Sequence, residues 1–287
     1  MLLVTGATGQ LGKGIVQFLE QKNKLSEVAV LVRDAAKAND LKEKGVTIRI
    51  GDYHQPELLN EALKGIDTVV LISSNDFNDR IGQHKNVVDA AVKNGVKHIL
   101  YTGVSMNAID TSPLKPFLGD HYETEAYIKA SGIPYTFLLH SLYADVLPMF
   151  IGPNPVETGV FFAAGEGKVT FADRLDLAEA IANILISEGH INKTYRMTNT
   201  TAYSFQEVAT YLSELSGKEV SYVSPTEKEF QEALEGMGLP TPIVQMSLGF
   251  AAGIKNNDFD TPFSDLQTIL GRKPTDLKAY LQKTYFN

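Results

Sequence analysis

One stretch decides the fold of this chain, and it reads Leu2-Leu3-Val4-Thr5-Gly6-Ala7-Thr8-Gly9-Gln10-Leu11-Gly12. The apolar residues at its start predict a short strand, and the helical spacing of Leu11, Ile15 and Leu19 predicts a helix at its end. A strand that turns through glycine into a helix leaves N–H groups without partners where the helix begins. Those donors and the helix dipole form a site for a pyrophosphate.

Three glycines give this loop a GxxGxxG spacing, with one residue more between the first two glycines than the common dinucleotide fingerprint has. Gly6 permits the tight turn, Gly9 lets a ligand approach the backbone, and Gly12 lets the helix pack closely on the strand. A purely structural turn is the alternative. We predict a dinucleotide-binding loop whose contacts come from Gly6, Ala7, Thr8, Gly9, Gln10, Leu11 and Gly12.

Composition excludes several classes of function. The formal net charge of −8 argues against broad binding of nucleic acid or of anionic membranes. The absence of cysteine excludes disulfides and thiolate catalysis, and the six histidines are scattered, so we expect no metal site. The N-terminus is typical of a folded strand rather than of a signal peptide, and no apolar run approaches the ~20 residues that span a bilayer. We therefore expect a cytoplasmic protein.

Strands and helices alternate through the first half of the chain. The apolar runs are nearly continuous, as is typical of parallel strands that are covered on both faces. Repeated β-α units predict an α/β fold with a Rossmann-type, doubly wound parallel sheet over residues 1–147. After the first strand, the predicted strands are 27–32, 46–50, 68–72, 98–102 and 135–139, and the predicted helices include 56–64, 83–93 and 121–130.

The pattern loosens after Leu147, where prolines and glycines gather. Residues 148–287 predict a smaller, mixed substrate-binding lobe, with segments that return to the Rossmann sheet. Its predicted elements are strands at 160–162, 194–197 and 218–223, a helix over 177–187 capped by Asp176, and helices that begin with capping boxes at Ser204 and Glu207 and at Thr226 and Glu229.

The end of the second strand selects the cofactor. A carboxylate at this place binds the ribose 2′-hydroxyl of NADH and repels a 2′-phosphate. Arg33 follows the strand here, ~20 residues after Gly12, and its guanidinium suits a phosphate. We therefore predict NADPH, and leave NADH open because Asp34 is able to turn back to a ribose. The alternative for Arg33 is a solvated residue paired with Asp34.

Polar residues follow the third and fourth predicted strands. Ligands of open α/β sheets bind beyond the carboxyl ends of the strands, so these residues face the expected cofactor. We predict contacts to the adenine from Asp52 and Tyr53, and contacts to the ribose and phosphates from Ser73, Ser74 and Asn75. Ordinary loop composition is the alternative for each of them.

Taken in order, these motifs resemble the NmrA-like group of atypical short-chain dehydrogenases/reductases, and within it the NAD(P)H:quinone oxidoreductase type 2 branch. The resemblance covers nearly the whole chain and rests on the order of several weak motifs, at 5–12, 32–33, 51–53, 71–74, 121–136, 165–168, 174–178 and 270–272. It implies a Rossmann core, NADPH at the glycine loop and Arg33, and a quinone or similar acceptor beside the nicotinamide.

Two departures from the family patterns affect the expected chemistry. Neither Tyr122 nor Tyr127 has a lysine four residues on, so the Tyr-x-x-x-Lys motif is missing, although Thr102 stands where the usual serine or threonine lies. The absence of this motif argues against a sugar-nucleotide epimerase more strongly than against a quinone reductase, because hydride transfer to a quinone yields a stabilised anion. After the sixth strand, Leu139 and His140 stand where the related branch has Arg and Asn.

Two side chains are the candidate catalytic proton donors, Tyr143 and His121. Tyr143, which the related branch keeps, and His140 are also predicted cofactor contacts. The alternatives are an aromatic residue at a domain seam for Tyr143, a surface contact between His121 and Glu125, and a core histidine for His140. Weaker candidates are the residues of an apolar pocket for a flat ring, with core packing as the alternative: Met149, Phe161, Phe162 and Phe171. Lys168 is a weaker candidate for a contact with a phosphate or the acceptor, with a solvated loop lysine as the alternative.

These observations predict an NAD(P)H-dependent oxidoreductase that transfers hydride from NADPH to a quinone or similar electron-poor carbonyl compound. The first alternative is a non-catalytic NADP(H) sensor that regulates a protein partner, and the second is a nucleoside-diphosphate-sugar epimerase. The expected ligand is a small aromatic or quinone-like molecule, and we expect no direct contact with nucleic acid or membrane. A homodimer or a protein partner stays open.

Overall fold

The computed structural model describes residues 1–76, 78–261 and 263–286, which fold into two compact units. Unit 1 comprises Met1–Val104, Asp120–Leu139 and Arg174–Tyr195. Unit 2 comprises the segments between and after these, which are Ser105–Gly119, His140–Asp173 and Arg196–Asn287. Unit 2 thus begins before the predicted boundary after residue 147. The segment 174–195 belongs to unit 1, and the prediction did include segments of the second lobe that return to the Rossmann sheet.

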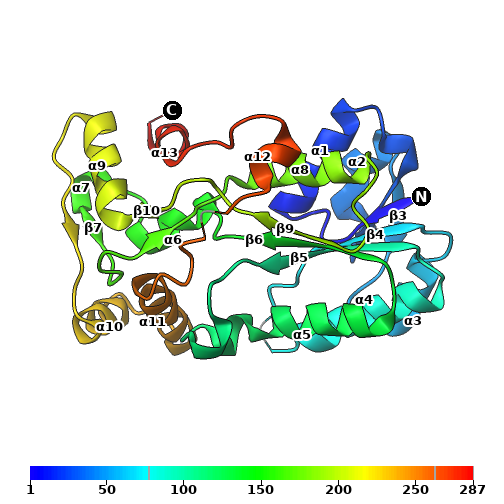
Figure 1. Cartoon of the computed structure of the whole chain (residues 1–287), viewed down its shortest axis with the longest axis horizontal. Coiled ribbons are helices and arrows are strands. Elements are labelled where there is room, and N and C mark those ends of the chain that lie inside the picture. Colours follow the sequence, from blue (N-terminus) through cyan, green and yellow to red (C-terminus); the bar gives the residue numbers. More distant parts are fainter. Residues whose placement is uncertain (77, 262, 287) are drawn as a thin grey trace. The chain divides into compact units, whose positions relative to one another are not determined.

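A seven-stranded sheet has the order β3-β2-β1-β4-β5-β6-β9 (Figure 1). Strand β1 lies between β2 and β4 and pairs with both in parallel, with Val4 opposite Val30 and Val70. The direction of winding changes at β1, which confirms the predicted doubly wound sheet. The strands are β1 (Leu2–Val4), β2 (Val28–Val32), β3 (Thr47–Ile50), β4 (Thr68–Leu71), β5 (His98–Val104), β6 (Tyr135–His140) and β9 (Lys193–Met197).

Helices cover both faces of this sheet, with α1 and α8 on one face and α3, α4 and α5 on the other (Figure 1). Beneath the second group, Tyr101 and Phe137 are fully buried in an apolar core. No helix among the described residues is long and apolar enough to cross a bilayer. The helices and 3-10 turns of this part are α1 (Gln10–Gln21), η1 (Leu25–Glu27), η2 (Ala35–Ala38), α2 (Asn39–Glu43), α3 (Pro56–Ala62), α4 (Arg80–Lys93), α5 (Lys115–Ser131) and α8 (Arg174–Leu185).

A glycine that the sequence analysis did not single out lets α1 lie against α8. A Cβ atom added to Gly14 would lie 2.8 Å from the Cβ of Ala178, so the two helix backbones approach closely only with small residues at both positions. This contact explains why the segment 174–195 belongs to unit 1.

Unit 2 combines short helices with two small sheets, in which β7 pairs with β11 and β8 pairs with β10. Its core is aromatic, and the rings of Phe162 and Phe205 stack with centroids 4.5 Å apart. Its elements are η3 (Ile109–Thr111), η4 (Ala144–Val146), α6 (Leu147–Ile151), α7 (Pro155–Thr158), β7 (Val160–Phe161), β8 (Lys168–Val169), β10 (Tyr203–Ser204), α9 (Phe205–Ser216), β11 (Tyr222–Val223), α10 (Glu227–Gly236), α11 (Thr241–Lys255), α12 (Leu266–Leu270) and α13 (Leu277–Tyr285).

The two predicted capping boxes are confirmed at the starts of α9 and α10. Three helix starts were predicted wrongly. Helix α4 begins at Arg80 rather than at Gln83. Helix α5 begins at Lys115 rather than at His121, because Pro116 is favourable in the first turn of a helix. Helix α8 begins at Arg174, so Asp176 lies inside its first turn and does not cap it.

The strand predicted over 218–223 is shorter than expected. Only Tyr222 and Val223 pair with β7. The Val220 N–H donates instead to the Ser213 hydroxyl at 2.9 Å, which holds the preceding residues against the end of α9.

Candidate active site

The glycine loop joins β1 to α1 in a narrow turn. Gly6 has a φ of +57°, in the left-handed region that favours glycine, and its carbonyl oxygen accepts from the Gly9 N–H at 2.9 Å. A Cβ atom on Gly12 would lie 2.4 Å from the same carbonyl oxygen and 2.7 Å from the Ala7 Cα. The predicted structural roles of Gly6 and Gly12, a turn and a close approach, are therefore confirmed.

The start of α1 fits a pyrophosphate. Its N-cap is Gly9, and within the described part of the chain no side chain caps it and no acidic residue occupies its first turn. A Cβ atom at Gly9 would meet a single neighbour, the Gly6 carbonyl oxygen at 3.2 Å. Free N–H donors at the positive end of a 12-residue helix are suited to hold an anion.

Hydrogen bonds of Thr5 and Tyr53 fix the end of β1, from which the glycine loop begins. The Thr5 hydroxyl donates to the Val70 carbonyl at 2.9 Å and accepts from the Ile72 N–H at 3.0 Å, which ties β1 to the end of β4. The Tyr53 hydroxyl contacts Thr5 Oγ1 and lies 3.0 Å from the Ile72 carbonyl oxygen. Burial raises the pKa of Tyr53, so its phenol stays neutral. The Tyr53 hydroxyl is thus committed inside the unit, and its predicted contact with adenine would involve the ring alone.

Arg33 and Asp34 follow β2 with different surroundings. The Asp34 carboxylate accepts from the Ala36 N–H at 2.9 Å and caps η2. The Arg33 side chain is exposed, and among the described residues it makes no hydrogen bond or ion pair. The alternative of an Arg33–Asp34 pair is therefore not what the structure has. An unpaired guanidinium and an occupied carboxylate favour a cofactor with a 2′-phosphate.

Asp52 also has a local partner. Its Oδ1 atom accepts from the His54 N–H at 2.9 Å, which forms a turn after β3. The second carboxylate oxygen makes no hydrogen bond to any described residue, and the adenine contact of Asp52 stays a prediction.

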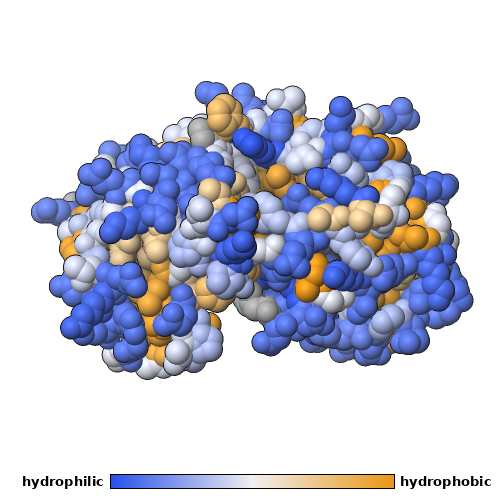
Figure 2. All heavy atoms as spheres, turned by 60° about the horizontal axis from the view of Figure 1, so that its bottom comes forward, coloured by the Kyte–Doolittle hydropathy of each residue, from blue (hydrophilic) through white to orange (hydrophobic). Residues whose placement is uncertain are grey.

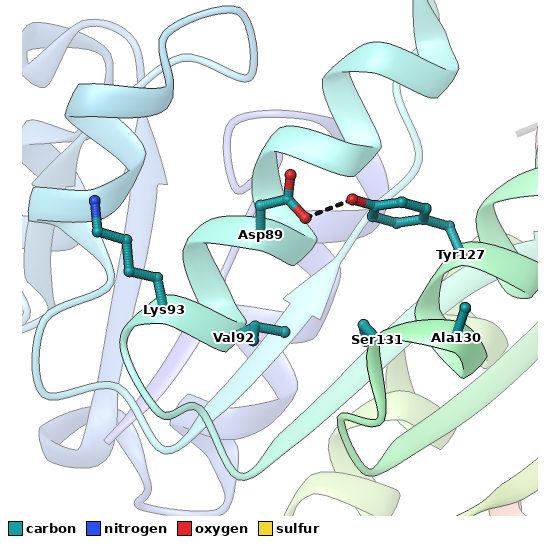
Figure 3. Close-up of a pocket in the computed structure, with 6 residues that line it drawn as sticks. All are labelled: Asp89, Val92, Lys93, Tyr127, Ala130 and Ser131. Carbon is teal, nitrogen blue, oxygen red and sulfur yellow. Dashed lines mark hydrogen bonds between the residues drawn. The ribbon is translucent and has the colours of Figure 1, made fainter.

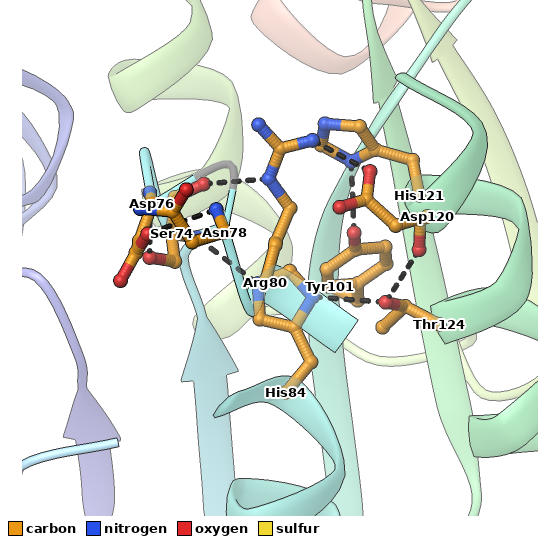
Figure 4. A network of polar contacts seen from close by, with 9 residues as sticks. All are labelled: Ser74, Asp76, Asn78, Arg80, His84, Tyr101, Asp120, His121 and Thr124. Carbon is orange, nitrogen blue, oxygen red and sulfur yellow. Dashed lines mark hydrogen bonds and ion pairs between the residues drawn. The ribbon is translucent and has the colours of Figure 1, made fainter. Parts of the chain in front are cut away.

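The predicted contact segment 73–75 is held by three hydrogen bonds from neighbouring elements, here called the clamp, and Figure 4 shows the two that are made to Ser74. The Ser73 N–H donates to Thr102 Oγ1 at 2.9 Å, and the Ser74 N–H donates to His84 Nε2 at 3.0 Å. Arg80 Nε donates to the Ser74 carbonyl at 2.8 Å. Sequence reasoning missed Arg80 and His84, although a charged residue and a histidine at the start of a helix that faces β4 were a usable signal.

The same two α4 residues connect the clamp to α5 (Figure 4). Arg80, only 3% exposed, pairs with the Asp120 carboxylate at 2.7 Å. His84 Nδ1 lies 2.9 Å from Thr124 Oγ1, whose proton is given to the Asp120 carbonyl. Because His84 Nε2 accepts from Ser74, its proton is on Nδ1. Burial, with a smaller effect from Arg80, lowers the pKa of His84 to about 3, so its ring stays neutral.

His121 lies in the second turn of α5 and is buried. Its Nδ1 atom is 2.8 Å from the Tyr101 hydroxyl (Figure 4). The alternative of a surface contact with Glu125 is therefore wrong for His121. Glu125 is itself half-buried on the following turn, where its carboxylate faces Gly103 at the end of β5.

His140 and Tyr143 form a pair in unit 2. The Tyr143 hydroxyl lies 2.9 Å from His140 Nδ1, and the two rings meet edge to face. A hydrogen bond from the Ala144 N–H to the Ala172 carbonyl at 2.9 Å holds the segment after Tyr143. The structure therefore brings these two predicted residues together. Their roles as cofactor contacts, and that of Tyr143 or His121 as proton donor, stay predictions.

The aromatic candidates separate into core and surface. Phe162 and Phe171 are buried in the core of unit 2, as the packing alternative expected, whereas Phe161 is 40% and Met149 72% exposed. Figure 2 shows a hydrophobic strip among hydrophilic side chains on the side where α10 and α11 lie. Lys168 borders a polar hollow with Lys255 and Asp260, and Glu166 also lines it, which fits a solvated lysine.

A hollow of about 370 Å³ lies between α4 and α5 (Figure 3). The Tyr127 hydroxyl donates to the Asp89 carboxylate across it at 2.6 Å. Because the helix of a β-α unit runs antiparallel to its strand, the C-terminal ends of α4 and α5 lie toward the amino ends of the strands. This hollow is therefore at the wrong edge for the predicted cofactor. It is lined by Asp89, Val92, Lys93, Tyr127, Ala130 and Ser131.

No group of three metal-ligating side chains occurs in residues 1–76, 78–261 and 263–286. The doubly wound sheet, the uncapped helix after a glycine turn and the open arginine after β2 define the class of Rossmann-type dinucleotide-binding proteins. Within that class, the chain belongs to the NmrA-like family, whose model matches residues 1–281. The predicted family is confirmed.

Relatives with named activities are similar over nearly their whole length. Quinone oxidoreductase 2 of Escherichia coli is 36% identical, over 96% of each chain. The crystal structure of an NADPH-dependent quinone oxidoreductase from Escherichia coli, complexed with NADPH, matches with a TM-score of 0.93 and 34% identity over 100% of both chains. That of Citrobacter sp. triphenylmethane reductase complexed with NADP(H) matches with a TM-score of 0.91 and 36% identity, over 99% of this chain and 100% of the other. These relatives confirm the predicted class of enzyme, which is an NAD(P)H-dependent oxidoreductase.

Proposed function

We propose that this chain is an NADPH-dependent oxidoreductase that reduces a quinone or a similarly electron-poor aromatic compound by hydride transfer. The observation that carries the proposal is the geometry of the first β-α unit, in which an uncapped helix start follows Gly6 and Gly9. At the end of β2 stands Arg33, which has no partner among the residues that the structure describes. The named activities of the quinone and triphenylmethane reductases at 34–36% identity support the choice of acceptor class.

Each part of unit 1 has a separate task toward the dinucleotide. The N–H groups at the start of α1 would hold the pyrophosphate, and Arg33 would hold the 2′-phosphate. Asp52 and Tyr53 would border the adenine. The clamped segment 73–75 would support the ribose and phosphates, because its backbone is fixed by three hydrogen bonds before any ligand arrives. When bound, NADPH supplies the hydride.

The acceptor chemistry makes modest demands on the protein. A quinone that receives a hydride becomes a resonance-stabilised anion, so positioning and one donor suffice in place of the missing Tyr-x-x-x-Lys motif. Tyr143, His140 and His121 are the proposed donors or contacts, and the exposed Phe161 and Met149 are proposed to border a flat ring. A cytoplasmic location and an association with a second copy stay predictions.

Absorbance of NADPH in the presence of menadione, benzoquinone or a cationic triphenylmethane dye tests the proposal. We expect steady oxidation by the wild-type chain, and loss of it in Gly9→Val, since the added side chain occupies the space above the helix start. Gly236→Val is the matched control, because a Cβ atom at Gly236 meets nothing within 4 Å. Tight NADPH binding without turnover on any acceptor would contradict the proposal and favour the sensing alternative.

A further inference from the structure

The carboxyl group of Glu125 lies over the carboxyl end of β5 in unit 1. A Cβ atom added to Gly103 would lie 3.0 Å from Glu125 Oε1 and 2.9 Å from Leu139 Cδ2. Glycine at position 103 therefore makes the room in which the carboxyl group sits, between α5, β5 and the apolar Leu139 of β6. Glu125 Oε1 is buried, and among the described residues it has no hydrogen-bond partner.

Burial, and not the neighbouring charges, favours the protonated form of this carboxyl. On its own helix, Lys129 lies one turn on and His121 one turn before, and from β5 the Tyr101 phenol faces it. Arg80, Asp120 and His84 lie near the Tyr101 side chain. Burial outweighs the attraction of Lys129 and raises the pKa of Glu125 to about 7.

This carboxyl lies near the carboxyl end of β5, beside Gly103. The residue before Gly103 is Thr102, whose hydroxyl accepts from the Ser73 N–H at 2.9 Å. Glu125 therefore stands at the same sheet edge as the segment 73–75, where ligands of doubly wound sheets bind. An acid poised near neutral pH at such an edge is suited to proton transfer.

We propose that Glu125 supplies the proton that accompanies the hydride when the acceptor is a quinone. The proposal rests on the proposed function. NADPH gives a hydride, with its electron pair, to the quinone and becomes NADP⁺. The Glu125 carboxyl O–H bond breaks, its proton joins the reduced quinone to complete the hydroquinone, and the carboxylate takes a new proton from water.

Two acceptor classes separate this role from a structural one. A cationic triphenylmethane dye needs only a hydride, because a carbocation and a hydride combine to a neutral product. A quinone needs a hydride and a proton. Removal of the acid should therefore slow quinone reduction alone, by about 100-fold, the lower end of what general acid catalysis contributes.

The experiment compares Glu125→Gln with Glu123→Gln, an exposed position on the same helix. We expect Glu125→Gln to bind NADPH like the wild type in calorimetry, to lose about 100-fold in kcat for menadione, and to reduce the dye within about threefold of the wild type. The wild-type rate with menadione should fall as pH rises above about 7, and this limb should be missing in the variant. Glu123→Gln should change neither rate.

A readout independent of turnover is the titration of ¹³Cδ-labelled glutamate in the protein without cofactor. One carboxyl resonance should titrate near pH 7 and be absent from Glu125→Gln. Unchanged menadione kinetics in the variant, or an equal loss with both acceptors, would overturn the proposal. If the wild type reduces quinones but not the dye, the comparison of acceptors is replaced by two readouts. The fall of the menadione rate above about pH 7 and the carboxyl resonance that titrates near pH 7 must then both be missing in Glu125→Gln, and persistence of either would overturn the proposal. A wild type that reduces no acceptor overturns the proposed function as well, whatever the resonance shows.

Discussion

Replacement of Arg80 by methionine removes the cation that joins α4, α5 and the segment after β4. The guanidinium is 3% exposed, pairs with Asp120 at 2.7 Å and donates to the Ser74 carbonyl at 2.8 Å. Methionine keeps much of the apolar stem and removes the charge. Asp120 and the Ser74 carbonyl then lose a partner.

The size of the effect follows from burial. Removal of one member of a buried ion pair costs ~3–5 kcal/mol, because the remaining charge is left uncompensated. Asp120 is 22% exposed, so water recovers part of this loss and we expect about 3 kcal/mol. The pair of Lys97 and Asp67 is equally short at 2.6 Å but its side chains are 77% and 46% exposed. Lys97→Met should therefore lower the free energy of unfolding much less than Arg80→Met, because water screens the exposed pair.

Urea denaturation followed by circular dichroism measures both variants. Because the Ser74 carbonyl loses the Arg80 donor, the variant should also bind NADPH about tenfold more weakly, a change of about 1.4 kcal/mol. This binding is measured without urea, at a temperature where the variant is folded. If Arg80→Met and Lys97→Met differ by less than about 1 kcal/mol, the account of the clamp is wrong.

Three further predictions concern the glycine loop, the cofactor and pH. Arg33→Ala should raise the Kd for NADPH by roughly 10- to 100-fold, the worth of a charge-assisted hydrogen bond, and leave the Kd for NADH unchanged in calorimetry; equal changes would remove the 2′-phosphate assignment. Gly12→Ala should lower the free energy of unfolding by roughly 2 kcal/mol and abolish NADPH binding, because its Cβ would lie 2.4 Å from a backbone oxygen, whereas Gly236→Ala should have little effect on either. The pKa of Glu125 rises on folding from 4.5 to about 7, so its stabilising contribution is full below pH 4.5 and is lost as pH rises through 7. Because Glu125 as a whole is only partly buried, we expect this loss to be roughly 1–2 kcal/mol. Wild type and Glu125→Gln, compared by urea denaturation at pH 5 and 8, should differ by that amount in their pH dependence, and parallel curves would contradict it.

Local patterns carried most of what the sequence predicted. The strand, glycine turn and helix at 2–21 are encoded by neighbouring residues, and the capping boxes at Ser204 and Thr226 lie within one helical turn. The order of the parallel strands follows from the general rule for repeated β-α units. Those parts needed no knowledge of distant contacts.

The clamp on Ser74 was not predictable in the same way. Arg80 and His84 act only because α4 presents them to the end of β4 and to α5, and the predicted helix start at Gln83 left Arg80 outside the helix. Likewise, the match of Gly14 with Ala178 joins segments far apart in the chain, which no local pattern reveals.

His121 shows how an error in a helix start changes a functional expectation. The predicted start at His121 placed it on a helix end, where a surface contact with Glu125 is plausible. Because α5 begins at Lys115, both residues lie inside the helix and face the sheet. His121 contacts the buried Tyr101, and Glu125 lies beside Gly103.

Calorimetric titration of the purified chain with NADPH measures whether the start of α1 and Arg33 hold a phosphorylated dinucleotide. We predict saturable binding of one NADPH per chain, with a Kd on the order of micromolar (about −8 kcal/mol), and weaker binding of NADH. Absence of binding by either dinucleotide would contradict it.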